Sequence, residues 1–252
     1  MKDSLLVRIA KERFDKVDSQ TVHFTGIREI DLYLNDLDNY PHAYVLACLM
    51  DRQIKAERAW QIPFFVSEKF GTKNINELST IGLDEYISLF ELEKFHRFNK
   101  VMAEVFYKGV LKIVNNYNSD ASLIWNNNPS SASVVYKFLE FKGSGIKIST
   151  MAANILARQF KIPFSDYYSI DISPDVHIKR VMKRIGYVPE KSNNDMIIYK
   201  ARELNPEFPG IIDFSCWEIG RNWCKPNNPD CDNCIVRNDC KRNITMQNEI
   251  LS

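Results

Sequence analysis

The sequence predicts an all-α protein, and three observations support this fold class. Glycine is scarce, with 9 residues in 252. No stretch of the chain shows the sustained alternation of apolar and polar residues that is typical of a half-buried strand. Apolar residues instead recur at intervals of three and four, as they do on one face of a helix.

The first half of the chain begins with an amphipathic stripe of Leu5, Leu6, Ile9 and Phe14. A strongly apolar run follows at 44–50, but it is far too short to span a bilayer. The charged N-terminus lacks the apolar region of a signal peptide. With 45% apolar residues the chain can bury a core of its own. We therefore expect a cytoplasmic protein without a membrane partner.

Two helical stripes in the middle of the chain flank a short turn. After a polar loop at 126–131, apolar residues line one helical face at 134–139 and again at 148–160. Gly143 and Gly145 lie between the stripes, and glycine allows a positive φ and a close approach of the backbone to a partner. The free N–H groups of the second helix would suit a DNA phosphate. A tight interhelical turn explains the glycines equally well.

Two further helices are expected downstream. Asp175 follows Pro174 and can cap a helix that stops at Gly186. Asp195 can cap another helix, which runs toward Leu204. A role as helix cap is enough by itself to explain the aspartate at position 175.

Four cysteines near the C-terminus have the spacing C-x6-C-x2-C-x5-C. They are Cys224, Cys231, Cys234 and Cys240. Thiolates are soft ligands that suit zinc or iron–sulfur centres. The spacing lacks the paired knuckles of common zinc sites and fits neither usual ferredoxin run. A zinc site and two disulfides are the alternatives, although disulfides belong mainly to oxidising compartments. Cys48 and Cys216 are expected in the core.

Basic residues are concentrated in one region although the formal net charge is only +1. Between residues 137 and 191 there are ten lysines and arginines but only five acidic residues. Such an excess of positive charge can form a phosphate footprint. Solvated helix faces are the simpler explanation for the same charges.

Three motifs resemble those of the endonuclease III-like helix-hairpin-helix DNA glycosylases. Gly143, Gly145 and Lys147 match the hairpin pattern L-P-G-hydrophobic-G-x-K. The segment 175–181 resembles the V-D-T-H-hydrophobic-x-R-V string that holds the family's catalytic aspartate, here Asp175. The cysteine spacing is similar to that of the family's [4Fe-4S] cluster loop. The motifs occur in the family's order, and the resemblance covers roughly 44–240.

The resemblance implies two all-α domains with an active site in the cleft between them. The six-helix domain that contains the hairpin would span 41–165. Residues 1–40 and 166–252 would form a discontinuous iron–sulfur domain, with a [4Fe-4S] cluster bound by the four cysteines. Lys142 and Ser144 depart from the hairpin pattern, at positions where proline and an aliphatic residue are usual.

The resemblance also implies a base-excision repair enzyme that acts on a damaged or mismatched base flipped out of double-stranded DNA. Lys147 would attack the sugar, displace the base and permit strand cleavage by β-elimination, an apurinic or apyrimidinic lyase activity. Asp175 would stabilise the cationic sugar or activate a nucleophile. Two alternatives are a monofunctional glycosylase that uses water activated by Asp175, and a non-catalytic DNA-binding module. Lys147 would then contact phosphate only.

Alignment with the family places Gln53 where a glutamine enters the space left by the flipped base. His96 or Arg97 falls near a second wedge, although all three are also ordinary polar residues of helix ends. The cluster loop would contact DNA through Lys225, its one basic residue. We expect a monomer that acts on DNA in the cytoplasm or nucleoid. The expected DNA-binding residues are Gly143, Gly145, Gln53, His96, Arg97, Lys179, Arg180 and Lys225.

Overall fold

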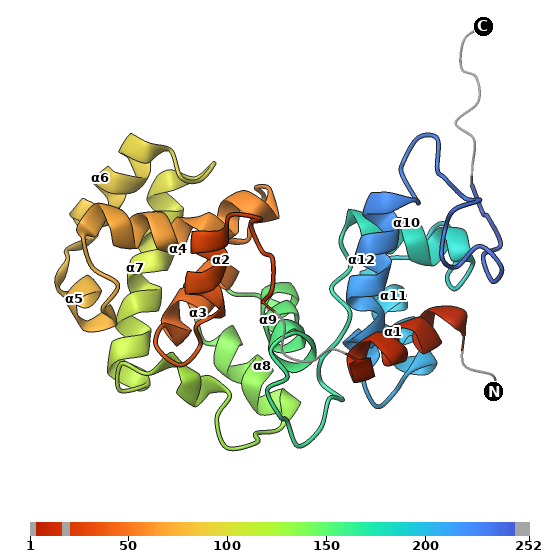
Figure 1. The fold of residues 1–252 in the computed structure, drawn as a ribbon, viewed down its shortest axis with the longest axis horizontal. Helices are drawn as coiled ribbons and strands as arrows, with labels where there is room; N and C mark the ends of the chain where they lie inside the picture. Colours follow the sequence, from red (N-terminus) through yellow and green to blue (C-terminus); the bar gives the residue numbers. More distant parts are fainter. Residues whose placement is uncertain (1–3, 17–20, 245–252) are drawn as a thin grey trace, which may run out of the picture. The chain divides into compact units, whose positions relative to one another are not determined.

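The computed structural model describes residues 4–16 and 21–244, and every regular element in these ranges is helical. This result confirms the predicted all-α fold class (Figure 1). The elements are α1 (Leu5–Lys16), α2 (Arg28–Asn35), α3 (Pro41–Met50), α4 (Ala56–Phe70), α5 (Ile75–Thr80), α6 (Leu83–Glu93), α7 (Asn99–Asn116), η1 (Ala121–Ile124), α8 (Ser131–Leu139), α9 (Ile146–Arg158), α10 (Val176–Ile185), α11 (Asn194–Leu204), η2 (Pro209–Ile212) and α12 (Asp213–Asn222).

The chain forms two compact units. Among the described residues, the central unit contains 21–165. The discontinuous unit contains 4–16 and 166–244. The sequence analysis placed residues up to 40 in the discontinuous domain. Residues 21–40 differ from that expectation, because they pack with the central unit.

Helix α3 forms the centre of the core of the central unit. All ten of its residues are buried, which explains why the sequence there is apolar on every face. The Tyr44 hydroxyl donates a hydrogen bond of 2.7 Å to the carbonyl of Ala152 on α9, so the buried phenol is satisfied. Cys48 is fully buried in this helix, as expected of a core residue.

Contacts of α2 explain why the segment before residue 41 joins the central unit. Tyr33 and Ser67 on α4 share a buried hydrogen bond of 3.0 Å. The ring of Phe24 stacks on Trp60 with a centroid separation of 4.2 Å. The buried carboxylate of Asp31 accepts hydrogen bonds from the backbone N–H of Thr25 at 2.8 Å and of Gly26 at 3.1 Å. Through these contacts the segment before residue 41 packs on α4 of the central unit.

In the discontinuous unit, α1 from the start of the chain lies beside α12 (Figure 1). An ion pair of 2.5 Å joins Arg13 to Glu218 on α12. The backbone N–H of Leu5 donates to the carboxylate of Asp239 at 2.9 Å. The N-terminal amphipathic stripe thus packs against the C-terminal part of the chain. Cys216, on α12, is fully buried as expected.

The expected ends of α10 are confirmed, but the expected cap of α11 is wrong. Asp175 caps α10, and Gly186 ends it with a left-handed φ of 89°. In α11, Asn193 is the N-cap, and its side chain accepts a hydrogen bond from the N–H of Met196 at 2.9 Å. Asp195 lies inside the first turn, where its negative charge interacts favourably with the helix dipole.

Within the part of the chain that the structure describes, no helix combines the length and apolar character needed to cross a membrane.

Candidate functional site

The predicted helical hairpin is present in the central unit as α8, a turn and α9. Gly143 has a left-handed φ of 84°, and the N–H of Ser144 closes the turn on the carbonyl of Phe141 at 3.0 Å. Gly145 has extended backbone with φ −119° and forms the N-cap of α9 without a side-chain cap. No heavy atom lies within 4 Å of a Cβ built at Gly145, so this backbone can be approached closely.

The two lysines of the hairpin have different surroundings. Lys147 lies exposed in the first turn of α9. Lys142 forms an ion pair with Glu104 on α7, which also binds Lys108 at 2.9 Å. The hydrogen bond from Lys142, followed by that from Lys108, lowers the pKa of Glu104 to about 2. The charge of Lys142 is therefore already engaged by a neighbouring carboxylate.

Asp175 is half-buried at the N-terminus of α10. Its Oδ1 accepts hydrogen bonds from the backbone N–H of His177 at 2.9 Å and of Ile178 at 2.8 Å. These two bonds fix the position of the carboxylate at the start of the helix. Lys147 belongs to the central unit and Asp175 to the discontinuous unit, and their approach in a cleft stays a prediction.

Gln53 lies in the loop between α3 and α4 with an exposed side chain and a φ of 55°. The left-handed region costs a non-glycine residue roughly 1–2 kcal/mol. Such strained positions concentrate at functional sites. Gln53 is one of nine non-glycine residues with a positive φ in the described part of the chain, so its role in the base stack stays a prediction.

A second loop, between α6 and α7, contains both His96 and Arg97. The His96 side chain is buried, with 2% exposure, and its Nδ1 accepts the N–H of Phe98 at 3.0 Å. Burial also lowers the pKa of His96. In this conformation the His96 ring stabilises the loop from the interior of the protein and is too buried to contact DNA directly. Arg97 and Phe98 are exposed instead, with the guanidinium 5.3 Å from the centroid of the Phe98 ring.

Phe98 was not among the residues selected from the sequence. Its ring is 42% exposed, which is unusual for phenylalanine, and it stands at the loop end just before α7. An apolar ring at this position suits a wedge between bases better than a buried imidazole does. The sequence gave no signal for Phe98, because most phenylalanine rings are buried in a core.

Arg58, on α4, holds this second loop in place and was also missed. Its Nε donates to the carbonyl of Phe95 at 3.1 Å, and its Nη2 donates to the carbonyl of Lys94. The two loops are thus neighbours, since His96 also lies close enough to the main chain of Arg52 and Met50 for them to raise its pKa. No sequence pattern links an arginine to carbonyl groups that lie more than thirty residues away.

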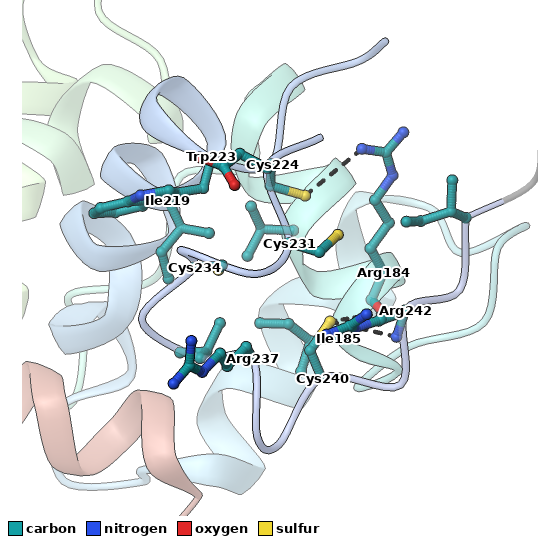
Figure 2. A pocket seen from close by; sticks show the side chains of 14 residues that line it. Arg184, Ile185, Ile219, Trp223, Cys224, Cys231, Cys234, Arg237, Cys240 and Arg242 are labelled. Carbon is teal, nitrogen blue, oxygen red and sulfur yellow. Dashed lines mark hydrogen bonds between the residues drawn. The ribbon is translucent and has the colours of Figure 1, made fainter. Parts of the chain in front are cut away.

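The four cysteines of the discontinuous unit come together around one pocket (Figure 2). Their side chains share it with apolar residues of α10 and α12 and with Arg184, Arg237 and Arg242. All four are free thiols, so the disulfide alternative finds no support in this structure. A set of four soft donors in a partly apolar pocket fits a zinc ion or an iron–sulfur centre.

The described residues contain no group of three or more His, Cys, Asp or Glu side chains already arranged to hold a metal ion. The thiols instead bind protein groups. Cys240 Sγ donates to the carbonyl of Arg184 at 3.4 Å and accepts the N–H of Arg242 at 3.4 Å. Burial raises the pKa of Cys234 and of Cys240. Metal ligation would require these thiols to rotate and lose their protons.

Two arginines of α10 attach this helix to the cysteine loop. Arg180 donates to the carbonyls of Cys224 at 2.6 Å and Gly220 at 2.8 Å. Arg184 donates to Cys224 Sγ at 3.7 Å and to the carbonyls of Lys225 at 2.6 Å and Pro226 at 2.9 Å. The contact between Arg184 and Cys224 Sγ is drawn as a dashed line in Figure 2. Arg180 is therefore engaged by protein groups, whereas the sequence analysis had expected it to bind DNA.

Basic residues line a groove between α10 and the loop at 226–229. Lys179 and Lys183 face this groove with Arg180 and Arg184. Lys225, at the start of the loop, is exposed. This part of the predicted basic region is therefore a surface with concentrated positive charge. Arg242 contributes less, because it forms an ion pair with the carboxylate of Asp232 at 3.4 Å, and Arg237 donates to the main-chain carbonyl of the same residue.

This arrangement of helices is the fold of endonuclease III. It places a helical hairpin in one unit and a capped helix beside four cysteines in the other. The predicted resemblance to endonuclease III-like helix-hairpin-helix glycosylases is confirmed in fold and in a local segment of sequence.

Particular proteins show this likeness. A 70-residue segment is 31% identical to endonuclease III of Thermotoga maritima and covers 28% of this chain and 33% of that protein. The aligned part thus spans about a third of the curated relative. No family model matches the chain.

The structural matches extend over nearly the whole chain. A trapped covalent intermediate of endonuclease III with DNA has a TM-score of 0.60 and 16% identity, covering 94% of this chain and 93% of that one. A non-covalent endonuclease III–DNA complex has 0.60 and 17%, with 94% and 92% covered. A thermostable thymine-DNA glycosylase has 0.60 and 13%, with 94% and 96% covered. At these identities the likeness concerns the fold.

Proposed function

We propose that this protein is a base-excision repair DNA glycosylase with lyase activity. The observation that carries the proposal is the exposed Lys147 in the first turn of α9, directly after a hairpin whose Gly145 backbone is open to a phosphate. The likeness to endonuclease III–DNA complexes supports double-stranded DNA as the partner.

In the proposed reaction the neutral amine of Lys147 attacks C1′ of the sugar. The bond between C1′ and the base breaks, and the base leaves with the bonding electrons. The amine then loses a proton, and the C1′–O4′ bond of the sugar ring breaks as O4′ takes up a proton, so that C1′ and the lysine nitrogen form a protonated imine. This imine allows loss of a proton from C2′, and the 3′ phosphate leaves with the bonding electrons by β-elimination. Asp175 stabilises the positive charge that develops on the sugar, because its carboxylate is held in place by two N–H groups.

DNA binding is assigned to several surfaces. Gln53 fills the gap left by the flipped base, with Phe98 and Arg97 at the second wedge in place of His96. The backbone at Gly143 and Gly145 contacts phosphate, as do Lys179 and Lys225. Contacts of this kind position the duplex but do not read its sequence.

We also propose that the four cysteines hold a [4Fe-4S] cluster. Cys224, Cys231, Cys234 and Cys240 would be its ligands, and the endonuclease III fold supports the assignment. The cluster would supply structural order to its loop, with no redox step on the base. A zinc ion on the same four thiols is the alternative.

The proposal is tested with a panel of duplexes, each of which contains one modified base or mismatch. Borohydride should trap a covalent complex with the wild-type protein on the preferred duplex, and Lys147→Gln should abolish the trapping. Lys108→Gln is the matched control, since Lys108 is an exposed lysine paired with Glu104. Asp175→Asn should lower the rate of base release by about 10² to 10³ while DNA affinity is retained.

Two outcomes would contradict parts of this proposal. If Lys147→Gln still released the base at the wild-type rate, the enzyme would be a monofunctional glycosylase that uses water activated by Asp175. If no duplex in the panel lost a base, the protein would be a non-catalytic DNA-binding module.

A further inference from the structure

A single arginine lies where the strained Gln53 loop meets the turn of the helical hairpin. Arg52 directly precedes Gln53, and its Nη1 lies 3.4 Å from the position that a Cβ would occupy at Gly143. Both segments belong to the central unit. The guanidinium is therefore located between the two surfaces to which DNA contacts are assigned.

The Arg52 guanidinium has no carboxylate as an ion-pair partner among the described residues. Within 4–16 and 21–244 its side chain also makes no hydrogen bond to a protein group. The nearest lysine of the same turn, Lys142, is paired with Glu104. His96 lies beside Arg52, and its lowered pKa keeps the imidazole neutral, so it adds no competing positive charge.

Arg52 is also only partly exposed, which limits the freedom of its side chain. A half-buried arginine without a carboxylate partner has donors that are already partly desolvated. Arginine forms two parallel hydrogen bonds with a phosphate, which a lysine cannot do. The geometry therefore favours a phosphate diester as its ligand.

We propose that Arg52 binds a backbone phosphate of the DNA strand and couples the hairpin turn to the Gln53 loop. This inference rests on the proposed DNA-binding function and deepens it. The phosphate bound by Arg52 would lie between the hairpin backbone and the side chain that enters the base stack. Arg52 would thus set the register of Gln53 on the duplex and acts as a positioning residue.

The test measures binding of the 252-residue protein at several salt concentrations to an undamaged duplex and to duplexes with one lesion placed opposite each of the four bases. Arg52→Met should make the slope of log K against log salt shallower by about 0.9, the value for one phosphate contact. Its affinity should fall about tenfold or more, as expected when one charge-assisted hydrogen bond is lost. Arg52→Lys should keep the slope but recover only part of the affinity. The control Lys108→Met should leave the slope unchanged.

The urea midpoint of Arg52→Met should equal that of the wild type, which separates a contact with DNA from a role in folding. An unchanged slope in Arg52→Met, while the wild-type protein binds duplex, would overturn the assignment of Arg52 alone. An affinity loss that depended on the base opposite a lesion, without a change in slope, would also overturn it, because Arg52 would then read the estranged base. Failure of base release would overturn the proposed function but leave this binding test intact.

Discussion

At the scale of single residues, the site depends on side chains held in unusual local states. Gln53 has a left-handed backbone, His96 has a buried neutral imidazole, and Asp175 has a carboxylate fixed by two N–H groups. The sequence motif identified Asp175, because the residues that follow it resemble a known string. His96 and Phe98 were harder to assign, since which of two neighbouring rings turns inward depends on packing against Arg52, Met50 and the rest of the loop.

Gln53→Gly should stabilise the fold while it impairs catalysis. Glycine relieves the left-handed strain but increases the entropy of the unfolded chain, so the free energy of unfolding should rise by about 0.5 to 1 kcal/mol. Base release should fall, because no side chain would fill the gap in the stack. Urea titration and single-turnover kinetics measure the two effects.

Asn128→Gly is the control for this substitution, since Asn128 also has a positive φ, of 51°. It should leave base release unchanged. Equal rates of base release for Gln53→Gly and the wild type would show that Gln53 has no part in the reaction.

At the scale of elements, the hairpin uses its two glycines for different purposes. Gly143 needs glycine for its φ of 84°, and a Cβ there would lie 3.0 Å from a methyl group of Val105 on α7. Gly145 has an extended backbone that any residue can adopt, and it faces open space. The sequence predicted the turn but could not separate these roles, because they depend on α7, which is distant in the chain.

Alanine should therefore affect stability at Gly143 and DNA binding at Gly145. Gly143→Ala should lower the free energy of unfolding by about 1 to 2 kcal/mol, because alanine is strained at positive φ and contacts Val105. Gly145→Ala should leave stability unchanged but weaken binding to every duplex, since its methyl group keeps a phosphate away from the backbone. Urea titration and DNA binding on two unrelated sequences measure these effects. Equal loss of stability in both variants would contradict this account of the turn.

At the scale of the whole molecule, each unit has its own core and its own candidate site residues. The central unit holds the hairpin and the loops of Gln53 and of Arg97, whereas the discontinuous unit holds Asp175 and the cysteine pocket. The amphipathic α1 closes the second unit through its contacts with α12. If the four cysteines bind the proposed metal centre, the stability of the cysteine region should depend on it, while the central unit folds on an apolar core.

Cys231→Ser should remove the yellow-brown colour and the four iron atoms expected in the purified protein. The discontinuous unit should then unfold at a lower temperature, because metal binding contributes to its folding, and the transition of the central unit should stay in place. Iron analysis, absorption spectra and calorimetry provide the measurements. Cys48→Ala is the control, since Cys48 is buried in α3 of the central unit and does not line the cysteine pocket. One zinc ion and no iron in anaerobically prepared protein would show that the cluster assignment is wrong.

The sequence by itself determined the features that depend on local spacing. The all-α class, the hairpin, the Asp175 cap and the four cysteines all follow from periodicity or motifs within a few residues of one another. Tertiary structure alone decided which polar side chains remain available. Arg180 and Arg184 bind carbonyls of the cysteine loop, Lys142 binds Glu104, and Arg52 reaches the hairpin turn. These partners are tens of residues away in the chain, and a charged side chain forms its bonds with whichever group the fold brings near.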